Sequence, residues 1–268
     1  MMIKNKSLWV SLSLAAVTCF PLSAVADDED YDEDSGWEFE IQAGFQREPT
    51  YVGSDRYISE PGFNIEATYE SQNGHQYFIG LGEVGAFFNL NNGWLLGTVL
   101  EYEPGRDNSE DPILSAFPEM EDTVEGQFTL AKKMGDWTVA GVFQPDVLDR
   151  GKGNVYFMAL EYEHEFNSRL SVGTTLDVSF ADKEHMNTEV GVSSDVARAS
   201  GLAAYEADSG FKSTTLSFEV GYQMTENWKL ISDFEAEFYG SNISDSPLVK
   251  DHGSDINYAV GIGIQYPF

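Results

Sequence analysis

The sequence predicts an all-β protein, a transmembrane antiparallel up-and-down β-barrel with short periplasmic turns and long extracellular loops. Three observations predict this fold. Residues 258–268 alternate between apolar and small or polar side chains and end on Phe268. Similar alternating segments recur along the chain, and tryptophans stand at the start of several of them. A period of two gives a strand two different faces, and in a membrane barrel one of these faces contacts lipid.

The N-terminus has the three parts of a secretory signal peptide. Lys4 and Lys6 precede an apolar run over residues 8–20, and a small-residue site ends at Ala26. The run is too short for a membrane-spanning helix, so we expect cleavage after Ala26. The predicted organisation is a cleaved signal peptide over residues 1–26, an acidic periplasmic linker over 27–36 and an outer-membrane β-barrel over 37–268.

The mature chain is strongly acidic. Cleavage removes Lys4 and Lys6, which leaves 13 basic and 45 acidic residues and a formal net charge of −32. Phosphate binding needs Lys and Arg, so this charge excludes nucleic acid as a partner. Cys19 lies inside the signal peptide, and the mature protein is therefore expected to lack disulfides.

Each predicted strand has an apolar phase that we expect to face lipid. In chain order this phase consists of Trp37, Phe39, Ile41, Ala43, Phe45; Phe63, Ile65, Ala67, Tyr69; Tyr77, Ile79, Leu81; Val84, Ala86, Phe88, Leu90; Trp94, Leu96, Thr98, Leu100, Tyr102; Val124, Gly126, Phe128, Leu130; Trp137, Val139, Gly141, Phe143; Tyr156, Met158, Leu160, Tyr162; Leu170, Val172, Thr174, Leu176, Val178, Phe180; Thr214, Leu216, Phe218, Val220, Tyr222; Trp228, Leu230, Ser232, Phe234, Ala236, Phe238; and Tyr258, Val260, Ile262, Ile264, Tyr266, Phe268. No helical pattern competes with these alternating segments.

The number of strands depends on residues 77–90, where the apolar phase changes parity. Two strands there give a barrel of twelve. Each would be shorter than the ~9–11 residues that a spanning strand needs, so a single bulged strand and a barrel of ten is the alternative. The count should be even if both termini are periplasmic, and of the two counts we expect twelve.

The connections between the strands alternate in length. Short ones are expected at residues 71–74, 91–93, 134–135, 167–168 and 223–227. Long ones are expected at residues 46–60, 103–123, 181–210 and 240–253. Short periplasmic turns and long extracellular loops are typical of outer-membrane barrels.

Aromatic residues mark one end of the predicted strands. Tryptophans open strands that rise from this end and tyrosines close strands that return to it: Trp37, Trp94, Trp137, Trp228, Tyr69, Tyr162, Tyr222 and Tyr266. We expect them to form an aromatic belt at the periplasmic interface of the membrane. Tyr266 and Phe268 are also the expected barrel-closing signal at the C-terminus.

The phase opposite to lipid carries many carboxylates. Those expected to form an acidic wall of the lumen are Glu38, Glu40, Glu66, Glu101, Glu103, Glu161, Glu163, Asp177, Glu219, Asp233 and Glu235. The inward basic residues, Lys133, Arg169 and Lys229, are expected near the periplasmic ends. An acidic wall attracts cations, so one hypothesis is a small channel for cations or cationic solutes. The alternative is a barrel plugged by its own loops, in which the carboxylates are only the polar phase.

The sequence predicts no enzyme, cofactor or metal site. The four histidines are scattered without metal-ligand spacing, and no Ser–His–acid constellation can be identified. Glu161, Glu163 and Glu165 share one strand face and could approach a cation. Ligands from a single strand rarely close a coordination shell, however.

Four short loop elements resemble those of one protein family. They are a P-x-Y-x-G-S-D element with Pro49, Tyr51, Gly53 and Ser54, a G-R step at Gly105 and Arg106, an A-S-G-L-x-x-Y-x-A stretch with Ser200, Gly201 and Tyr205, and a D-S-P-[IL]-V loop with Ser246 and Pro247. They occur in order over nearly all of the mature chain. On these elements the chain resembles the MltA-interacting protein (MipA/OmpV) family.

The resemblance implies a location in the bacterial outer membrane, in contact with its lipid and lipopolysaccharide after insertion by the barrel assembly machinery. It also implies a non-enzymatic scaffold linked to murein synthesis and turnover, which brings a lytic transglycosylase together with a bifunctional murein synthase. Other members look like porins, which keeps the channel as the alternative. From the residues alone, we expect the loop elements to shape and seal the extracellular end. The acidic linker is the exposed segment that could dock a basic partner.

Overall fold

The computed structural model describes residues 35–268, which form a closed barrel of twelve antiparallel strands. The expected signal peptide and most of the expected linker lie outside the described residues. The strands are β1 Gly36–Pro49, β2 Tyr57–Glu70, β3 Gln76–Ile79, β4 Glu83–Asn89, β5 Trp94–Glu103, β6 Thr123–Met134, β7 Trp137–Pro145, β8 Asn154–Asn167, β9 Leu170–Ala181, β10 Gly210–Gln223, β11 Lys229–Tyr239 and β12 Ile256–Pro267. The predicted fold and the count of twelve are confirmed, and residues 77–90 contribute two strands rather than one.

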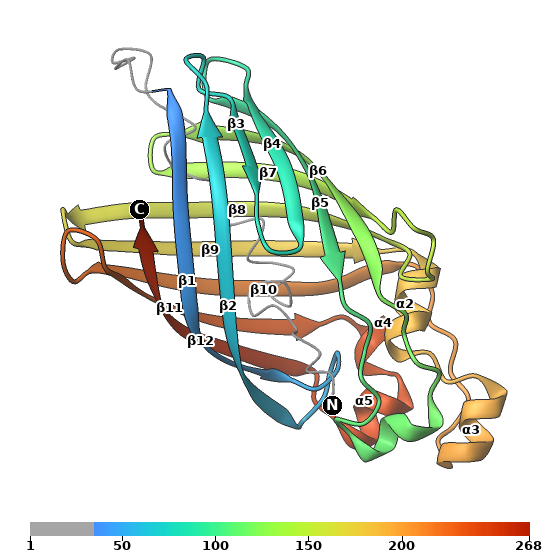
Figure 1. Cartoon of the computed structure of the whole chain (residues 1–268). Helices are drawn as coiled ribbons and strands as arrows, with labels where there is room; N and C mark the ends of the chain where they lie inside the picture. Colours follow the sequence, from blue (N-terminus) through green and yellow to red (C-terminus); the bar gives the residue numbers. More distant parts are fainter. Residues whose placement is uncertain (1–34) are drawn as a thin grey trace.

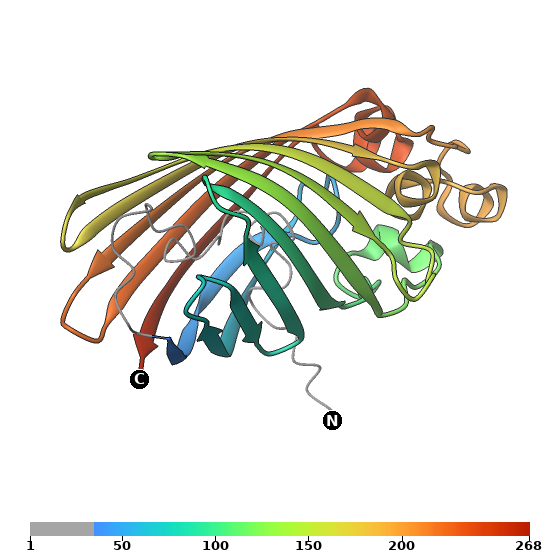
Figure 2. The ribbon, with the colours of Figure 1, turned by 90° about the horizontal axis from the view of Figure 1, so that it is seen from above.

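The barrel closes where β1 pairs with β12. Every other strand pairs with its neighbours in the chain, so the described strands have no open edge (Figures 1 and 2). Such closure is required in lipid, where an unpaired backbone N–H or C=O finds no water. At the seam Gly44 lies opposite Gly263, and the Phe268 N–H donates to the Phe39 carbonyl oxygen at 2.9 Å.

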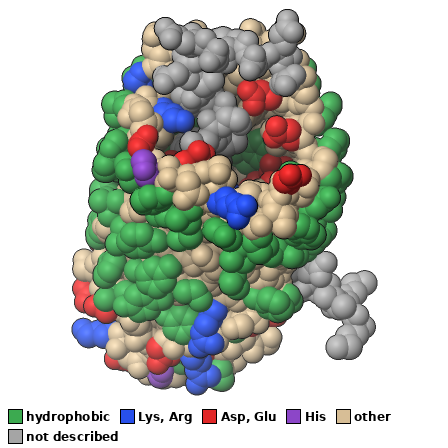
Figure 3. Space-filling model, turned by 90° about the vertical axis from the view of Figure 1, so that its left-hand side faces the viewer, with side chains coloured by type: hydrophobic (Ala, Val, Ile, Leu, Met, Phe, Trp, Pro, Cys, Tyr) green, Lys and Arg blue, Asp and Glu red, His purple; other side chains and the backbone are tan. Residues whose placement is uncertain are grey.

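Alternation sets the two faces of the wall. On β5 the side chains of Trp94 and Leu96 are 44% and 45% exposed, whereas Leu95 between them is 2% exposed. The same pattern on neighbouring strands produces the apolar band on the outer surface of the barrel (Figure 3). This band is the surface that contacts lipid in an outer-membrane barrel.

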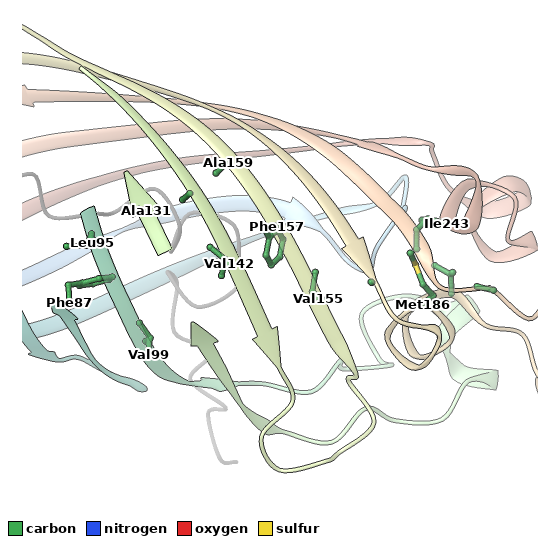
Figure 4. Close-up of a cluster of buried hydrophobic side chains, with 14 of the residues drawn as sticks. Phe87, Leu95, Val99, Ala131, Val142, Val155, Phe157, Ala159, Met186 and Ile243 are labelled. Carbon is green, nitrogen blue, oxygen red and sulfur yellow. The ribbon is translucent and has the colours of Figure 1, made fainter. Parts of the chain in front are cut away.

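The inner face is not polar throughout. Buried apolar side chains line the inside of β4–β8 and continue toward the helices of the loops (Figure 4). They include Phe87, Leu95, Val99, Val142 and Phe157. The expected acidic wall is therefore interrupted, because apolar side chains share the inner face of β4–β8 with carboxylates.

Short helices stand in the long loops, where the sequence analysis found no helical pattern. They are η2 Pro112–Ala116, α2 Lys183–Val190, α3 Ser194–Ser200, α4 Ser241–Ser244 and α5 Pro247–His252. No helix in residues 35–268 is long and apolar enough to cross a membrane. Side-chain caps rather than apolar periodicity define several of them: Asp182 caps α2, Ser193 caps α3 and Ser246 caps α5. One expected loop is also shorter, since β1 and β2 extend to leave only residues 50–56 instead of 46–60.

The seam gives a test of closure. A Cβ atom at Gly44 would lie 2.8 Å from the Gly263 Cα atom, whereas at Gly141 on β7 it would meet nothing within 4 Å. We expect Gly44→Ala to lower the free energy of unfolding by about 1–3 kcal/mol, because the backbone of β12 must shift. Gly141→Ala is the matched control and should be close to neutral. Urea unfolding in lipid vesicles measures both; equal midpoints for the two variants would contradict a tight seam.

Candidate functional site

The lumen carboxylates form three groups that the strand register brings together. Glu40 on β1 lies opposite Glu66 on β2. On the next wall Glu101 lies opposite both Glu83 and Glu125. The third and largest group lies on β8–β11 and comprises Glu161, Glu163, Asp177, Glu219, Asp233, Glu235 and Glu237. Of the other predicted wall residues, Glu38 is exposed at the turn end of the barrel and Glu103 lies at the opposite end of β5.

The three groups differ in the hydrogen bonds that their carboxylate oxygens accept. In the first group, Gln42 Nε2 donates to Glu40 at 2.5 Å and Thr68 Oγ1 donates to Glu66 at 2.9 Å. In the second, Gln127 Nε2 donates to Glu101 at 3.2 Å. In the third, Ser213 and Tyr239 donate to Glu237, whereas both buried carboxylate oxygens of Asp177 have no hydrogen-bond partner. Asp177 is therefore the member of the third group with unused acceptor capacity.

The aromatic residues predicted for the belt lie at the end that carries the short turns, called here the turn end. Three of the tryptophans contact tyrosines of neighbouring strands, and the ring centroids are 5.4 Å apart for Trp37–Tyr69, 4.8 Å for Trp137–Tyr162 and 4.8 Å for Trp228–Tyr266. The Lys132 ammonium lies 5.5 Å from the ring centroid of Trp94, and Tyr222 is exposed near the end of β10. Phe268 stacks on Phe39 at 5.7 Å.

The opposite end, called here the loop end, is covered by a packed cap. The loops and their helices gather there, away from the C-terminus (Figure 1). Leu114, Met186, Ile243 and Leu248 are completely buried within these loops, and Val249 is 1% exposed. A small hydrophobic core of this kind gives the loops one defined arrangement over the barrel mouth.

The loop elements that resemble the family hold the cap together. The Tyr51 hydroxyl donates to the His252 carbonyl oxygen at 3.0 Å, and the Tyr205 hydroxyl donates to the Asn242 carbonyl oxygen at 3.0 Å. Ser246 Oγ donates to the carbonyl oxygen of Val190, the last residue of α2, at 2.6 Å. These bonds tie segments that lie up to 201 residues apart in the chain.

The remaining motif residues shape the backbone of the same cap. Gly201 ends α3 in the left-handed conformation with a φ of 82°, and Gly53 has a φ of 81°, which favours glycine. Pro247 is the first residue of α5 and Pro49 is the last residue of β1. The Gly105 N–H donates to the Asp122 carboxylate. Ser200 Oγ donates to the Val196 carbonyl oxygen within α3. Ser54 Oγ lies 2.8 Å from Thr50 Oγ1.

A cavity of about 260 Å³ lies beneath the cap. Charges of both signs line it, among them Arg106, Lys152, His185, Glu189 and Lys212. Lys152 Nζ lies 3.3 Å from Glu103 Oε1, and Lys212 Nζ lies 3.9 Å from Glu237 Oε1. The Arg106 guanidinium donates to the Glu189 backbone carbonyl at 3.3 Å. The ion pairs join the loop before β8 to β5 and β10 to β11, and the Arg106 hydrogen bond attaches α2 to the loop that follows β5.

Unlike Arg106, Lys152 and Lys212 could not be placed at this end from the sequence. Lys152 lies in the loop between β7 and β8, where alternation gives no direction. Strict alternation along β10 would point Lys212 toward lipid, in the same phase as Thr214 and Leu216. A register shift between Phe211 and Ser213 reverses this phase, so that Phe211 is 39% exposed and Lys212 only 9%.

His185 on α2 is held as a neutral ring. Its Nδ1 donates to the Lys152 carbonyl oxygen at 2.9 Å, and its Nε2 is buried without a partner. Burial, together with the charge of Lys212, lowers the pKa of His185 to about 4. For Glu189, burial alone would raise the pKa, but the nearby charges of Arg106, Lys212 and Lys152 bring it below the ordinary value.

The neutral His185 makes the cap sensitive to acid. Because the histidine pKa is near 6.5 when α2 is open and about 4 when it is closed, the open state binds more protons and the cap weakens as pH falls through this range. We expect the free energy of opening of α2 to fall by roughly 2 kcal/mol from pH 7 to pH 5. Hydrogen exchange of the α2 amides, corrected for intrinsic rates, measures this change.

The control for this prediction is His185→Asn, which removes the titrating ring. Its opening free energy should depend much less on pH over the same interval. An equal pH dependence in the variant, or none in the wild-type protein, would show that His185 does not control the cap.

Comparison with known proteins agrees with this architecture. The family model of the MltA-interacting protein MipA matches residues 41–268. Outer membrane protein Omp26La of Vibrio anguillarum is 25% identical to this chain over 188 residues. Outer membrane protein OmpV of Vibrio cholerae serotype O1 is 27% identical over 190 residues. Each alignment covers 70% of this chain and 68% of the relative. An outer membrane channel from Pseudomonas putida F1 has a similar fold, with a TM-score of 0.51 and 12% identity over 91% of this chain and all of that one. The chain belongs to the MltA-interacting protein MipA family and is an outer-membrane β-barrel.

Proposed function

We propose that this chain is a non-enzymatic scaffold of the outer membrane, linked to murein synthesis and turnover. Its partner would be a lytic transglycosylase at the periplasmic face, with a bifunctional murein synthase as the second member of the assembly. The description of the matching family, an MltA-interacting protein, supports a partner of this kind.

The observation that carries the proposal is the packed cap at the loop end. Side chains such as Leu114, Met186 and Leu248 have no exposed surface there, and hydrogen bonds from Arg106 and to the Lys152 carbonyl hold α2 in place. A barrel whose outer mouth is filled in this way is better suited to presenting a stable surface than to free passage of solutes.

The surface available for a partner is the turn end, which is the periplasmic end of outer-membrane barrels. Its connections are short, and a specific interface buries about 800 Å² on each partner. The acidic segment at residues 27–35 precedes β1, which begins at this end with Gly36. We propose that this segment supplies much of the contact, because seven acidic residues in it would attract a basic surface.

A second candidate function is a small channel selective for cations. The three groups of lumen carboxylates favour it, since they would concentrate cations and repel anions. In this case the cap would have to move before solute could pass.

Capture of the partner tests the scaffold. The mature protein, refolded in detergent and immobilised, should retain a purified lytic transglycosylase at about 0.15 M salt. Replacing the acidic residues of 27–34 by the corresponding amides should reduce retention by about tenfold or more, because the attraction to a basic surface is lost. Retention should also fall as the salt concentration rises.

The matched control places the same kind of substitution in the outer loops. Asp195→Asn and Asp208→Asn remove exposed charges at the loop end, and we expect them to leave retention unchanged. Equal retention of the transglycosylase by the linker variant and the control would show that residues 27–35 do not dock the partner. No retention by the wild-type protein would show that the scaffold proposal is wrong.

A further inference from the structure

The cavity of about 260 Å³ beneath the cap, called here the cap cavity, contains polar groups that the protein leaves without a direct ionic or hydrogen-bond partner. Its two lysines are not among them, since each forms an ion pair with a glutamate of the barrel wall. The groups in question belong to three other lining residues, Arg106, His185 and Glu189. They stand on α2 and on the loop that follows β5, at the loop end of the barrel (Figure 1).

Arg106 reaches the cap cavity from the loop between β5 and β6 and has no ionic partner. Its guanidinium donates to Asn108 Oδ1 and to the Glu189 carbonyl oxygen, both at 3.3 Å, and its Cζ atom lies 5.8 Å from the ring centroid of Phe117. None of these contacts with described residues supplies a negative charge. A guanidinium has five N–H donors in a planar fork that matches a carboxylate, so Arg106 can still bind one.

α2 presents two acceptors to the same cavity. His185 and Glu189 are four residues apart and therefore share one face of the helix. Because Nδ1 of His185 donates to the Lys152 carbonyl oxygen, Nε2 of the neutral ring is an acceptor. His185 is only 9% exposed, and this acceptor is buried without a partner. The Glu189 carboxylate is half-buried and accepts no hydrogen bond from the described residues.

These unused groups indicate a ligand, because buried polar groups are normally hydrogen-bonded. Arg106 and the Glu189 carboxylate interact electrostatically, yet they do not form an ion pair. An anion between them would neutralise only the guanidinium, and a cation would neutralise only the carboxylate. A neutral ligand would leave both charges buried, which is unfavourable away from water. A zwitterion satisfies both, with its carboxylate on Arg106 and its ammonium group on Glu189 and His185 Nε2.

The volume and the apolar part of the lining limit the ligand further. One water molecule requires roughly 10–15 Å³, so the cap cavity is large enough for a small organic molecule. Val155 and Phe157 are 6% and 4% exposed and line the cavity together with Val52 and Met120. These side chains offer an apolar surface, which fits an amino acid with an aliphatic side chain.

A second cavity, of about 460 Å³, gives access from the outside of the barrel. It shares Arg106, Met120 and Lys152 with the cap cavity, so the two lie on either side of these side chains. Its lining also includes Arg150, whose side chain is 50% exposed, and Thr188 of α2. The second cavity therefore reaches the outer surface of the loops, and a ligand has a path to the guanidinium of Arg106.

We propose that the cap cavity binds a zwitterionic α-amino acid of the leucine type, which enters from the loop end. Its carboxylate pairs with Arg106, its ammonium group donates to Glu189 and His185, and its side chain packs against Val155 and Phe157. This binding activity goes beyond the scaffold role and is independent of it, because the site lies in the cap whereas the surface for a murein enzyme lies at the turn end.

Isothermal titration of the refolded mature protein with L-leucine at pH 7 and about 0.15 M NaCl tests the proposal. We expect one saturable site. Leucinamide keeps the ammonium group without the carboxylate, and N-acetylleucine keeps the carboxylate without the ammonium group. Each derivative should bind about tenfold more weakly than leucine or worse, because each loses one charge-assisted contact.

Arg106→Gln tests the residue assigned to the carboxylate. This variant should bind leucine about tenfold more weakly, and its affinities for leucine and leucinamide should become nearly equal. A loss of packing alone would weaken both ligands and leave their ratio unchanged. Arg150→Gln is the matched control, since Arg150 lines the second cavity but pairs with Glu121 at 2.6 Å. It should bind leucine within about twofold of wild type.

Heat-modifiable migration in gels verifies that both variants are folded, and the comparison of leucine with its derivatives on the wild-type protein needs no variant. Absence of saturable leucine binding would overturn the proposal. So would equal affinity of the wild-type protein for leucine and the two derivatives, equal weakening by Arg106→Gln and Arg150→Gln, or an unchanged ratio of leucine to leucinamide affinity in Arg106→Gln.

Discussion

Closure of the backbone hydrogen bonds between β1 and β12 is the constraint on which the rest of the structure depends. A strand edge left open in lipid would expose unpaired N–H and C=O groups at a cost of several kcal/mol each. Closure forces every strand to present one face to lipid and the other to the interior. The apolar band outside and the carboxylates inside are both consequences of this one requirement. The lumen is thus the place where the chain can hold charge away from bulk water.

The two ends of the barrel use different physical means to complete the molecule. At the turn end the connections are short, and aromatic pairs such as Trp137–Tyr162 surround the barrel, as we expect of residues at a membrane interface. At the loop end the chain builds a second small core, and ion pairs below it join Lys152 to Glu103 and Lys212 to Glu237. The cap and the lumen carboxylates of β8–β11 are consequently separate features, since the cap is built from loops and the carboxylates stand on the wall.

Much of the wall could be predicted from the sequence, because alternation is a local property. The strands, their lipid-facing phase and the division of residues 77–90 into β3 and β4 all followed from the order of apolar and polar residues. The helices of the cap did not, since caps such as Asp182 and the packing of Met186 determine them and no apolar period does. Lys212 was missed because a bulge reverses its phase. The grouping of the carboxylates on β8–β11 required the register between four strands, which a single sequence does not specify.

The central claim is that the described loops seal the outer mouth of this barrel at neutral pH. Single-channel recording of the refolded mature protein in a planar bilayer, with a salt gradient across it, tests this claim most directly. A packed cap predicts that heat-modifiable, correctly inserted protein adds no steady conductance. Discrete, long-lived conductance steps at neutral pH would contradict a sealed outer mouth. A cation-selective reversal potential in the same recording would favour the channel function, with the lumen carboxylates attracting cations.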